Sequence, residues 1–190
     1  MRKQIFEKSK TEKKIIGVRL YGDEDDFWLG YIEDFNEEII QLRIFDSLGI
    51  DDGVVIEQQE NIDSIDFDSD YEQTYEFLIN KNYDLKQMQE IIGFKNSINW
   101  RKEYLDESLL RNELISFQFS ENQKIYGYVL DLTDKEFIIN AISHLGECEG
   151  KTIYKIEDIK AIAFSNRKSK LRQELNTWRK ATNINKTNRK

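Results

Sequence analysis

An internal repeat constrains the fold of this chain more than any other feature of the sequence. Residues 18–67 align with residues 115–164 without a gap, and twelve of the fifty aligned positions are identical. Gly30, Gly49 and Gly53 of the first segment all recur in the second. Glycine is needed where the backbone adopts a conformation, or comes to a close approach, that a side chain would block. We therefore expect the two segments to adopt one fold and to superpose strand on strand.

Each copy of the repeat has the pattern of a small antiparallel sheet. Segments rich in β-branched and aromatic residues alternate with clusters of Gly, Asp, Asn and Ser, which is typical of strands and turns. Gly30 and Gly127 lie inside the second expected strand, where a glycine indicates a bend. The expected strands of the first copy are residues 15–21, 27–35, 39–45, 54–57 and 62–67. The predicted fold is mainly β with α, with two tandem five-stranded small barrels, each followed by a helix.

Helical spacing of apolar residues follows both copies. It predicts helices over residues 71–81 and 85–92 after the first copy, and a third helix after the second. In the third helix, Leu171, Leu175 and Trp178 form one stripe, which we expect to pack into the core. The predicted organisation is a basic N-terminal segment at 1–14, an acidic barrel at 15–70, a helical connector at 71–107, a second barrel at 108–166, and a basic C-terminal helix and tail at 167–190.

The bent strand of the first copy resembles the first sequence motif of Sm-like proteins. That motif has a glycine, an aliphatic residue two positions later and then Phe-Asp/Asn, and residues 30–36 read Gly-Tyr-Ile-Glu-Asp-Phe-Asn. A looser version begins at Gly127, so the resemblance implies tandem small barrels of the Sm-like or SH3 type. The second Sm motif, an Arg-Gly pair, is absent, and the asparagine that reads RNA in the family falls near Ile40 and Phe137. The resemblance therefore implies the barrel without the family's uridine pocket.

Charge is unevenly distributed along the chain, whose formal net charge is −8. Residues 15–71 carry 17 acidic and 2 basic side chains, whereas residues 1–14 carry 6 basic and 2 acidic ones. Residues 165–190 carry 9 basic side chains and 1 acidic side chain. An acidic surface repels nucleic-acid phosphate and attracts basic partners. The acidic barrel is therefore expected to bind a basic protein, or else to be covered by the basic ends of the chain.

No group of residues forms a strong catalytic or metal-binding motif. His144 and Cys148, the only His and Cys, could pair as base and nucleophile, but no further Cys or His completes a zinc site. Residues 66–70 resemble half of a calcium loop, yet Tyr71 and Phe77 stand where that loop needs Gly and Glu. We predict no catalytic residue, no metal site and no cofactor.

The same composition predicts a cytoplasmic protein. A single Cys cannot form an internal disulfide, which fits a reducing compartment. No apolar run approaches the ~18–20 residues of a membrane span, and the first residues lack the apolar core of a secretory signal. The absence of proline and the abundance of Lys, Asn, Ile and Glu suggest a bacterial source.

The leading hypothesis is a non-enzymatic protein-interaction module, in one version an immunity- or antitoxin-type inhibitor that uses its acidic barrel against a basic toxin. Charge complementarity suits such rapid capture. Because side chains alternate along a strand, one of Phe27 and Trp28 should face outward. Trp28 aligns with Ile125 and Phe27 with Lys124, so Trp28 is expected in the core and Phe27 at the surface. The predicted partner-binding residues are Phe27, Glu37, Glu38, Asp51 and Asp52.

Two alternatives remain open at this level. An Sm-like nucleic-acid-binding protein would use the basic ends, with Arg167, Lys168, Lys170 and Arg172 as contacts. A hydrolase would need a carboxyl group in an apolar pocket that raises its pKa. The carboxylates available for such a site are Glu33, Asp34, Glu37, Glu38, Asp51 and Asp52.

Overall fold

The computed structural model describes residues 1–21, 27–81, 92–120 and 123–187, in two compact units that span Met1–Asn96 and Ser97–Lys190. The helix expected over residues 85–92 lies outside the described residues, apart from Ile92. Of the helices in the described residues, none has the length and apolar character that crossing a membrane requires.

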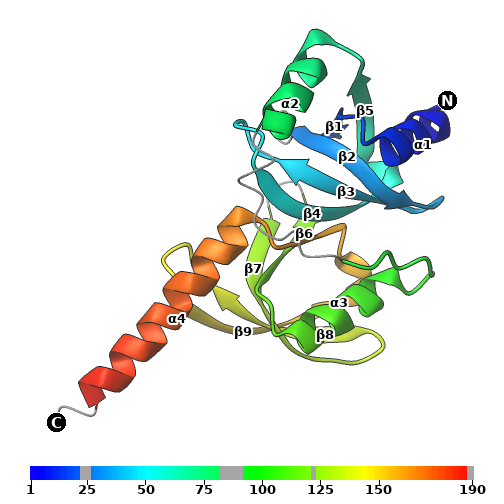
Figure 1. The fold of residues 1–190 in the computed structure, drawn as a ribbon. Coiled ribbons are helices and arrows are strands. Elements are labelled where there is room, and N and C mark those ends of the chain that lie inside the picture. Colours follow the sequence, from blue (N-terminus) through cyan, green and yellow to red (C-terminus); the bar gives the residue numbers. More distant parts are fainter. Residues whose placement is uncertain (22–26, 82–91, 121–122, 188–190) are drawn as a thin grey trace. The chain divides into compact units, whose positions relative to one another are not determined.

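Unit 1 is an antiparallel sheet between two helices (Figure 1). Its strands follow the order β5-β1-β2-β3-β4. The elements are α1 (Arg2–Glu12), β1 (Ile16–Leu20), β2 (Phe27–Phe35), β3 (Ile39–Phe45), β4 (Asp51–Gln58), the 3₁₀ turn η1 (Gln59–Asn61), β5 (Ile62–Phe67) and α2 (Asp70–Lys81). All five strands expected from the sequence are present.

Unit 2 repeats this plan with the strand order β10-β6-β7-β8-β9. Its elements are α3 (Trp100–Arg111), β6 (Ile115–Ser120), β7 (Gln123–Leu132), β8 (Glu136–Ile142), β9 (Cys148–Lys155), the 3₁₀ turn η3 (Ile156–Asp158), β10 (Ala161–Phe164) and α4 (Arg167–Thr187). Both units therefore consist of a leading helix, five strands and a trailing helix.

The prediction of barrels is wrong, because neither sheet closes. Among the described residues of unit 1, β5 pairs with β1 and β4 pairs with β3, and no ladder joins β4 to β5. Closure would require the two edge strands to meet along their length. The two edge strands are joined only along the chain, by the three-residue turn η1.

The duplication is confirmed by backbone details that the two units share. Gly49 and Gly146 both have a left-handed conformation, with φ of 74° and 76°. Asp68 and Ser165, which precede the trailing helices, adopt φ of 60° and 55°. Each of these pairs is separated by the 97 residues of the sequence alignment, so the two copies share their turns as well as their strands.

The gapless alignment, in contrast, fails in the first strand of each unit. Gly30 pairs with Ile16, and Gly127 pairs with Ile115, so the first strands lie 99 residues apart instead of 97. The chain between the first two strands is shorter in unit 2. A shift of two residues keeps the same side chains on the core face, because side chains alternate with a period of two. The sequence pattern therefore looks continuous across the change.

The repeat also includes the leading helices, which the sequence alignment did not detect. The Ser9 hydroxyl donates to the Lys14 carbonyl at 2.8 Å, and the Ser108 hydroxyl donates to the Glu113 carbonyl at 3.5 Å. Both pairs are related by the offset of 99 residues. The basic segment 1–14 therefore contains α1, and residues 71–107 contain both α2 of unit 1 and the start of α3 of unit 2.

The expected core stripe of α4 is wrong. Leu171 and Trp178 are 54% and 61% exposed and Leu175 is half-buried, whereas the buried side chains among the described residues of this helix are those of Ser169 and Asn176. Asn176 donates a hydrogen bond from Nδ2 to the Gly146 carbonyl at 2.9 Å. A loop carbonyl that the helix covers needs a donor, which asparagine supplies and leucine cannot. The helix therefore contacts the loop through a polar side chain, Asn176, and through Leu175 beside it.

The N-terminal basic segment folds back onto the acidic sheet of unit 1. Lys8 and Lys14 pair with Asp68 at 3.3 and 2.6 Å, and Lys10 pairs with Asp34 at 2.6 Å. These ion pairs are partly exposed, so each contributes little to stability. They show that fold-back, one of the two interpretations of the uneven charge, applies to residues 1–14.

Asp68 makes this contact sensitive to acid. The hydrogen bond from Lys14, followed by that from Lys8, lowers the pKa of Asp68 below its ordinary value of 3.8. Because folding lowers the pKa of Asp68, the ion pairs of Asp68 stabilise the fold fully above about pH 4. This stabilisation is lost as the pH falls through the folded-state pKa. We expect carboxyl NMR titration to give Asp68 a midpoint below 3.8 that rises in Lys14→Ala. An unchanged midpoint in that variant would contradict the assignment.

Candidate functional site

The two units differ in charge. Unit 1 carries 11 basic and 23 acidic side chains, which gives a net charge of −12. Unit 2 carries 17 basic and 13 acidic side chains, which gives +4. The potential around unit 1 therefore attracts cations and repels polyanions.

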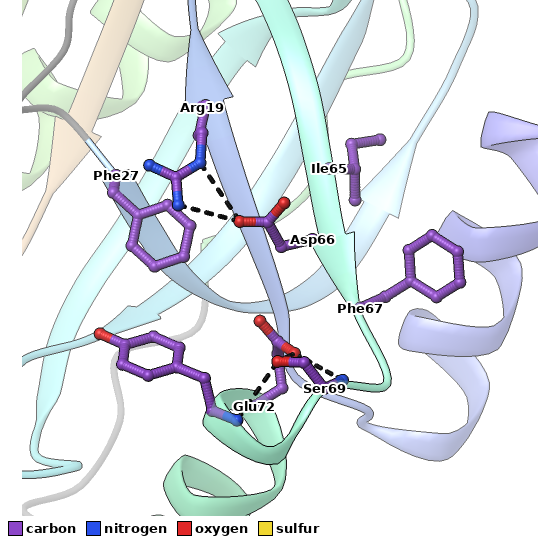
Figure 2. Close-up of a pocket in the computed structure, with 8 residues that line it drawn as sticks. Arg19, Phe27, Ile65, Asp66, Phe67, Ser69 and Glu72 are labelled. Carbon is purple, nitrogen blue, oxygen red and sulfur yellow. Dashed lines mark hydrogen bonds and ion pairs between the residues drawn. The ribbon is translucent and has the colours of Figure 1, made fainter.

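Unit 1 has an open groove of about 610 Å³ where β1, β2 and β5 meet the start of α2. We call it the Phe27 groove (Figure 2). The side chains that define it are Arg19, Phe27, Asp66, Phe67, Tyr71 and Glu72. The surface is both aromatic and charged, which suits a ligand that carries apolar and polar groups together.

Gly17 sets the position of the Phe27 ring. A Cβ atom at Gly17 would come within 2.2 Å of Phe27 Cζ, so the ring lies directly against the glycine backbone. Any side chain at position 17 would displace the ring. Phe27 was expected at the surface, but it is half-buried and packs against the core cluster that includes Leu29, whereas its neighbour Trp28 is buried as expected.

Arg19 lies over the outer side of Phe27. Its Cζ atom is 4.5 Å from the ring centroid, within the range of a cation–π interaction. Its Nε and Nη2 atoms donate to Asp66 Oδ2 at 3.2 and 3.0 Å (Figure 2). The side chains of Arg19 and Asp66 are 47% and 42% exposed, so solvent reaches this ion pair.

The start of α2 forms the second wall of the groove. The Tyr71 ring lies 6.0 Å from the Phe27 ring, and its hydroxyl is 3.3 Å from that of Tyr75. This hydrogen bond, followed by burial, raises the pKa of Tyr75 to about 12. Glu72 is buried and accepts a hydrogen bond from the Ser69 amide at 2.8 Å, as in a capping box. The accessible features of this wall are therefore aromatic.

Unit 2 keeps the fold but differs at most of the groove positions, although Phe164 corresponds to Phe67. At the offset of 99, Ser116 replaces Gly17 and Gln118 replaces Arg19. At the offset of 97, Lys124 replaces Phe27, Ala163 replaces Asp66 and Lys168 replaces Tyr71. Since unit 2 forms the same strands without them, the fold does not require these five groove residues. They are the positions at which unit 1 is free to carry a function.

The predicted acidic contacts lie at opposite ends of the sheet. Glu37 is exposed and Glu38 half-buried in the turn after β2, whereas Phe27 begins that nine-residue strand. Asp51 and Asp52 lie at the start of β4, at the same end of the sheet as Phe27. Asp51 accepts hydrogen bonds from the Gly53 amide and, at 3.5 Å, from Arg43. The structure therefore does not gather these carboxylates into one patch.

Arg43 holds two of the carboxylates proposed for a hydrolase. It pairs with Glu33 Oε1 at 2.8 Å and with Asp51 Oδ2 at 3.5 Å. Asp34 pairs with Lys10. Burial raises the pKa of Tyr31, which lies beside Arg43 in this cluster. Glu33 and Asp51 are thus engaged in ion pairs within the sheet, and Asp34 in an ion pair with helix α1.

The basic residues proposed for nucleic acid have two different environments. Arg167, Lys168 and Lys170 are exposed. Arg172 instead donates to the Ile142 carbonyl at 2.8 Å, and its guanidinium lies 3.9 Å from the Tyr126 ring centroid. Arg172 therefore attaches α4 to the sheet of unit 2.

His144 and Cys148 are both exposed, and the Cys148 thiol hydrogen-bonds Asn140 Oδ1 at 2.8 Å. In the half-calcium-loop segment 66–70, Asp66 and Asp68 pair with basic side chains. Within the part of the chain that the structure describes, no group of three or more His, Cys, Asp or Glu side chains is arranged to hold a metal ion.

No family model, no curated protein and no solved structure matches this chain. The Phe27 groove is thus interpreted from its own chemistry. Sequence reasoning identified Phe27 but missed Gly17, Arg19, Asp66 and Tyr71. The signal for Asp66 and Tyr71 is present in the repeat, because the aligned residues in the second copy, Ala163 and Lys168, differ in charge or aromatic character.

Proposed function

We propose that this chain is a non-enzymatic, cytosolic binding protein whose unit 1 captures a basic segment of a protein partner in the Phe27 groove. One observation carries the proposal: an accessible aromatic groove lies in a unit of net charge −12, and lysines replace two of its aromatic residues in unit 2. An immunity- or antitoxin-type inhibitor of a basic toxin is the version that best uses these properties.

The two features of unit 1 would act at different stages of binding. The acidic surface accelerates the encounter with a basic partner, mainly through the association rate. The rings of Phe27 and Tyr71 provide contact area and attract cationic side chains, which slows dissociation. Charge selects the class of partner, and the groove would select the segment.

We also propose that both units derive from a small barrel of the Sm-like or SH3 type that has opened. The shared strand order, the glycine in the second strand and the short turn before the fifth strand support this origin. The proposed binding site does not use the position of the family's uridine pocket.

The engagement of the carboxylates favours binding over hydrolysis. A general acid or base needs a carboxyl group that is free to exchange its proton with a substrate. Arg43 lies between Glu33 and Asp51, and Lys10 neutralises Asp34. This arrangement favours a structural role for the three carboxylates.

The test is an NMR titration of the full chain with a peptide of alternating Gly and Arg, and separately with one of alternating Gly and Glu. We expect the cationic peptide alone to shift the amide signals of Gly17, Phe27 and Tyr71, with an affinity that falls as salt rises. The triple variant Phe27→Lys, Asp66→Ala and Tyr71→Lys copies unit 2. We expect it to bind at least about tenfold more weakly, which is roughly 1.4 kcal/mol.

A matched control separates the groove from charge alone. Glu60→Lys with Glu37→Gln makes the same change in net charge at two exposed positions that do not line the groove. It should retain most of the affinity. Equal losses in the control and the triple variant, or binding of the Glu peptide at the groove, would contradict the proposal.

Nucleic-acid binding by α4 is a second candidate, which one observation favours. Trp178 is exposed on the same helix as Lys168 and Lys170, and an exposed ring among cations can stack on an unpaired base. A single-stranded oligonucleotide should then quench the fluorescence of this chain in low salt, and Trp178→Phe should remove most of the quenching. Quenching that survives in Trp178→Phe would count against this candidate.

A further inference from the structure

Arg19 occupies the part of the Phe27 groove that a cationic ligand would need. We infer that the groove is a guanidinium site occupied in cis by Arg19, and that the partner supplies an arginine side chain that replaces it. This inference rests on the proposed function and narrows it, because it names arginine as the side chain that the groove recognises.

The contacts of Arg19 are those that a bound arginine would make. Its guanidinium lies over the Phe27 ring, with Cζ 4.5 Å from the ring centroid, and donates two hydrogen bonds to Asp66. A planar guanidinium can lay its flat face on a ring and donate several hydrogen bonds from its edge at the same time, whereas the compact ammonium of lysine has no flat face. The groove therefore already displays its complementarity to guanidinium.

Three observations indicate that Arg19 is replaceable. The Arg19–Asp66 pair is almost half exposed, and such pairs contribute little to stability. Both hydrogen bonds from Arg19 fall on Asp66 Oδ2, and no donor from the described residues is bonded to Oδ1. Unit 2 forms the same strand with Gln118 at this position. The fold therefore does not depend on Arg19.

Occupation in cis lowers the affinity for the partner. The partner can bind only while Arg19 has moved out of the site. The apparent affinity is therefore the intrinsic affinity multiplied by the fraction of molecules in which the site is open. Removing Arg19 should raise the affinity for an arginine-bearing peptide. If Arg19 were instead part of the surface that holds the partner, its removal would lower this affinity.

The experiment compares Arg19→Gln, which copies unit 2, with the parent chain. The probes are the peptide of alternating Gly and Arg and the same peptide with Lys in place of Arg. We expect Arg19→Gln to bind the Arg peptide roughly five- to tenfold more tightly, the scale of one exposed ion pair and one cation–π contact. The gain for the Lys peptide should be smaller, within about twofold.

Lys3→Ala is the control for net charge, because it removes one positive charge at an exposed position of unit 1 that does not line the groove. It should change neither affinity by more than about twofold, as expected for a distant surface charge in moderate salt. Arg19→Ala should repeat the result of Arg19→Gln, so that the outcome does not depend on the glutamine. Equal gains for the Arg and Lys peptides, or no gain at all, would overturn the inference.

The failure of this inference differs from the failure of the proposed function. If neither peptide shifts the groove amides in the parent or in Arg19→Gln, the result contradicts both the guanidinium site and the proposed function. The Arg peptide could instead bind in a way that requires Phe27 and Tyr71 but does not change when Arg19 is replaced. That result contradicts only the guanidinium site and leaves the groove as a site for basic segments.

Discussion

Arg43→Leu should lower the free energy of unfolding of unit 1 by about 3–5 kcal/mol, the cost of leaving paired carboxylates without their cation inside a fold. The Arg43 side chain is only 3% exposed, and it contacts Glu33 at 2.8 Å and Asp51 at 3.5 Å. Gln41, also buried, donates to the second oxygen of Glu33 at 2.8 Å. Leucine would fill part of the space but would satisfy neither carboxylate.

Hydrogen exchange resolved by segment is the suitable measurement, because it separates β3 and its neighbours from unit 2. Amides of β3 should exchange faster by a factor that corresponds to the lost stability. Arg19→Leu is the control, since it breaks an ion pair that is almost half exposed and should cost no more than about 1 kcal/mol. Similar losses in the two variants would mean that burial does not determine the role of Arg43.

The structural role of Arg43 could not be predicted from the sequence. The aligned residue in the second copy is Asn140, so the repeat gives no sign of a buried cation. A charged residue in a strand is normally expected on the solvent face. Only the folded structure, in which Arg43 pairs with Tyr31 and Val54 across the sheet, brings Glu33 of β2 and Asp51 of β4 within reach of its guanidinium.

The strands were predictable because their pattern is local. Alternating apolar residues and turn clusters located β1 to β5, and the recurrence of Gly30 as Gly127 indicated that the second sheet would follow the first. Sheet closure was not predictable, because it depends on whether β4 and β5 meet, which no local pattern records. The leading helix α1 was missed because, in its eleven residues, only Phe6 and Ser9 are buried.

The candidate site was predictable in part. Alternation along β2 together with the aligned residues Lys124 and Ile125 predicted that Trp28 is buried and Phe27 exposed; Trp28 is buried, but Phe27 is half-buried and packs against the core. Its partners lie on other elements: Arg19 on β1, Asp66 on β5 and Tyr71 on α2. Contacts between elements depend on register and on helix placement, which sequence spacing does not supply. The two-residue shift between β1 and β6 also concealed that Gly17 corresponds to Ser116.

Gly30→Ala should destabilise unit 1 by about 3 kcal/mol or more, at the upper end of the usual range for overpacking. A Cβ atom at Gly30 would lie 1.8 Å from the Arg43 carbonyl oxygen and 2.8 Å from the Arg43 carbonyl carbon. Both are backbone atoms of the paired strand β3, so no side-chain rotation relieves the clash. The strands would have to separate where Gly30 pairs with Ile44, and the ladder between β2 and β3 would be interrupted.

Gly127, the equivalent of Gly30 in the second copy, would suffer a weaker clash and therefore serves as a comparison. A Cβ atom at Gly127 would lie 2.4 Å from the Asn140 carbonyl oxygen, and its next contacts are with the movable side chain of Ile139. Gly127→Ala should therefore destabilise unit 2 less than Gly30→Ala destabilises unit 1. Gly93→Ala, whose new Cβ would meet only Lys95 Nζ at 3.9 Å, should change stability by no more than about 0.5 kcal/mol. Segment-resolved hydrogen exchange of the three variants should reproduce this order. If Gly30→Ala is no worse than Gly127→Ala, the close approach of β3 does not explain the glycine in the bent strand.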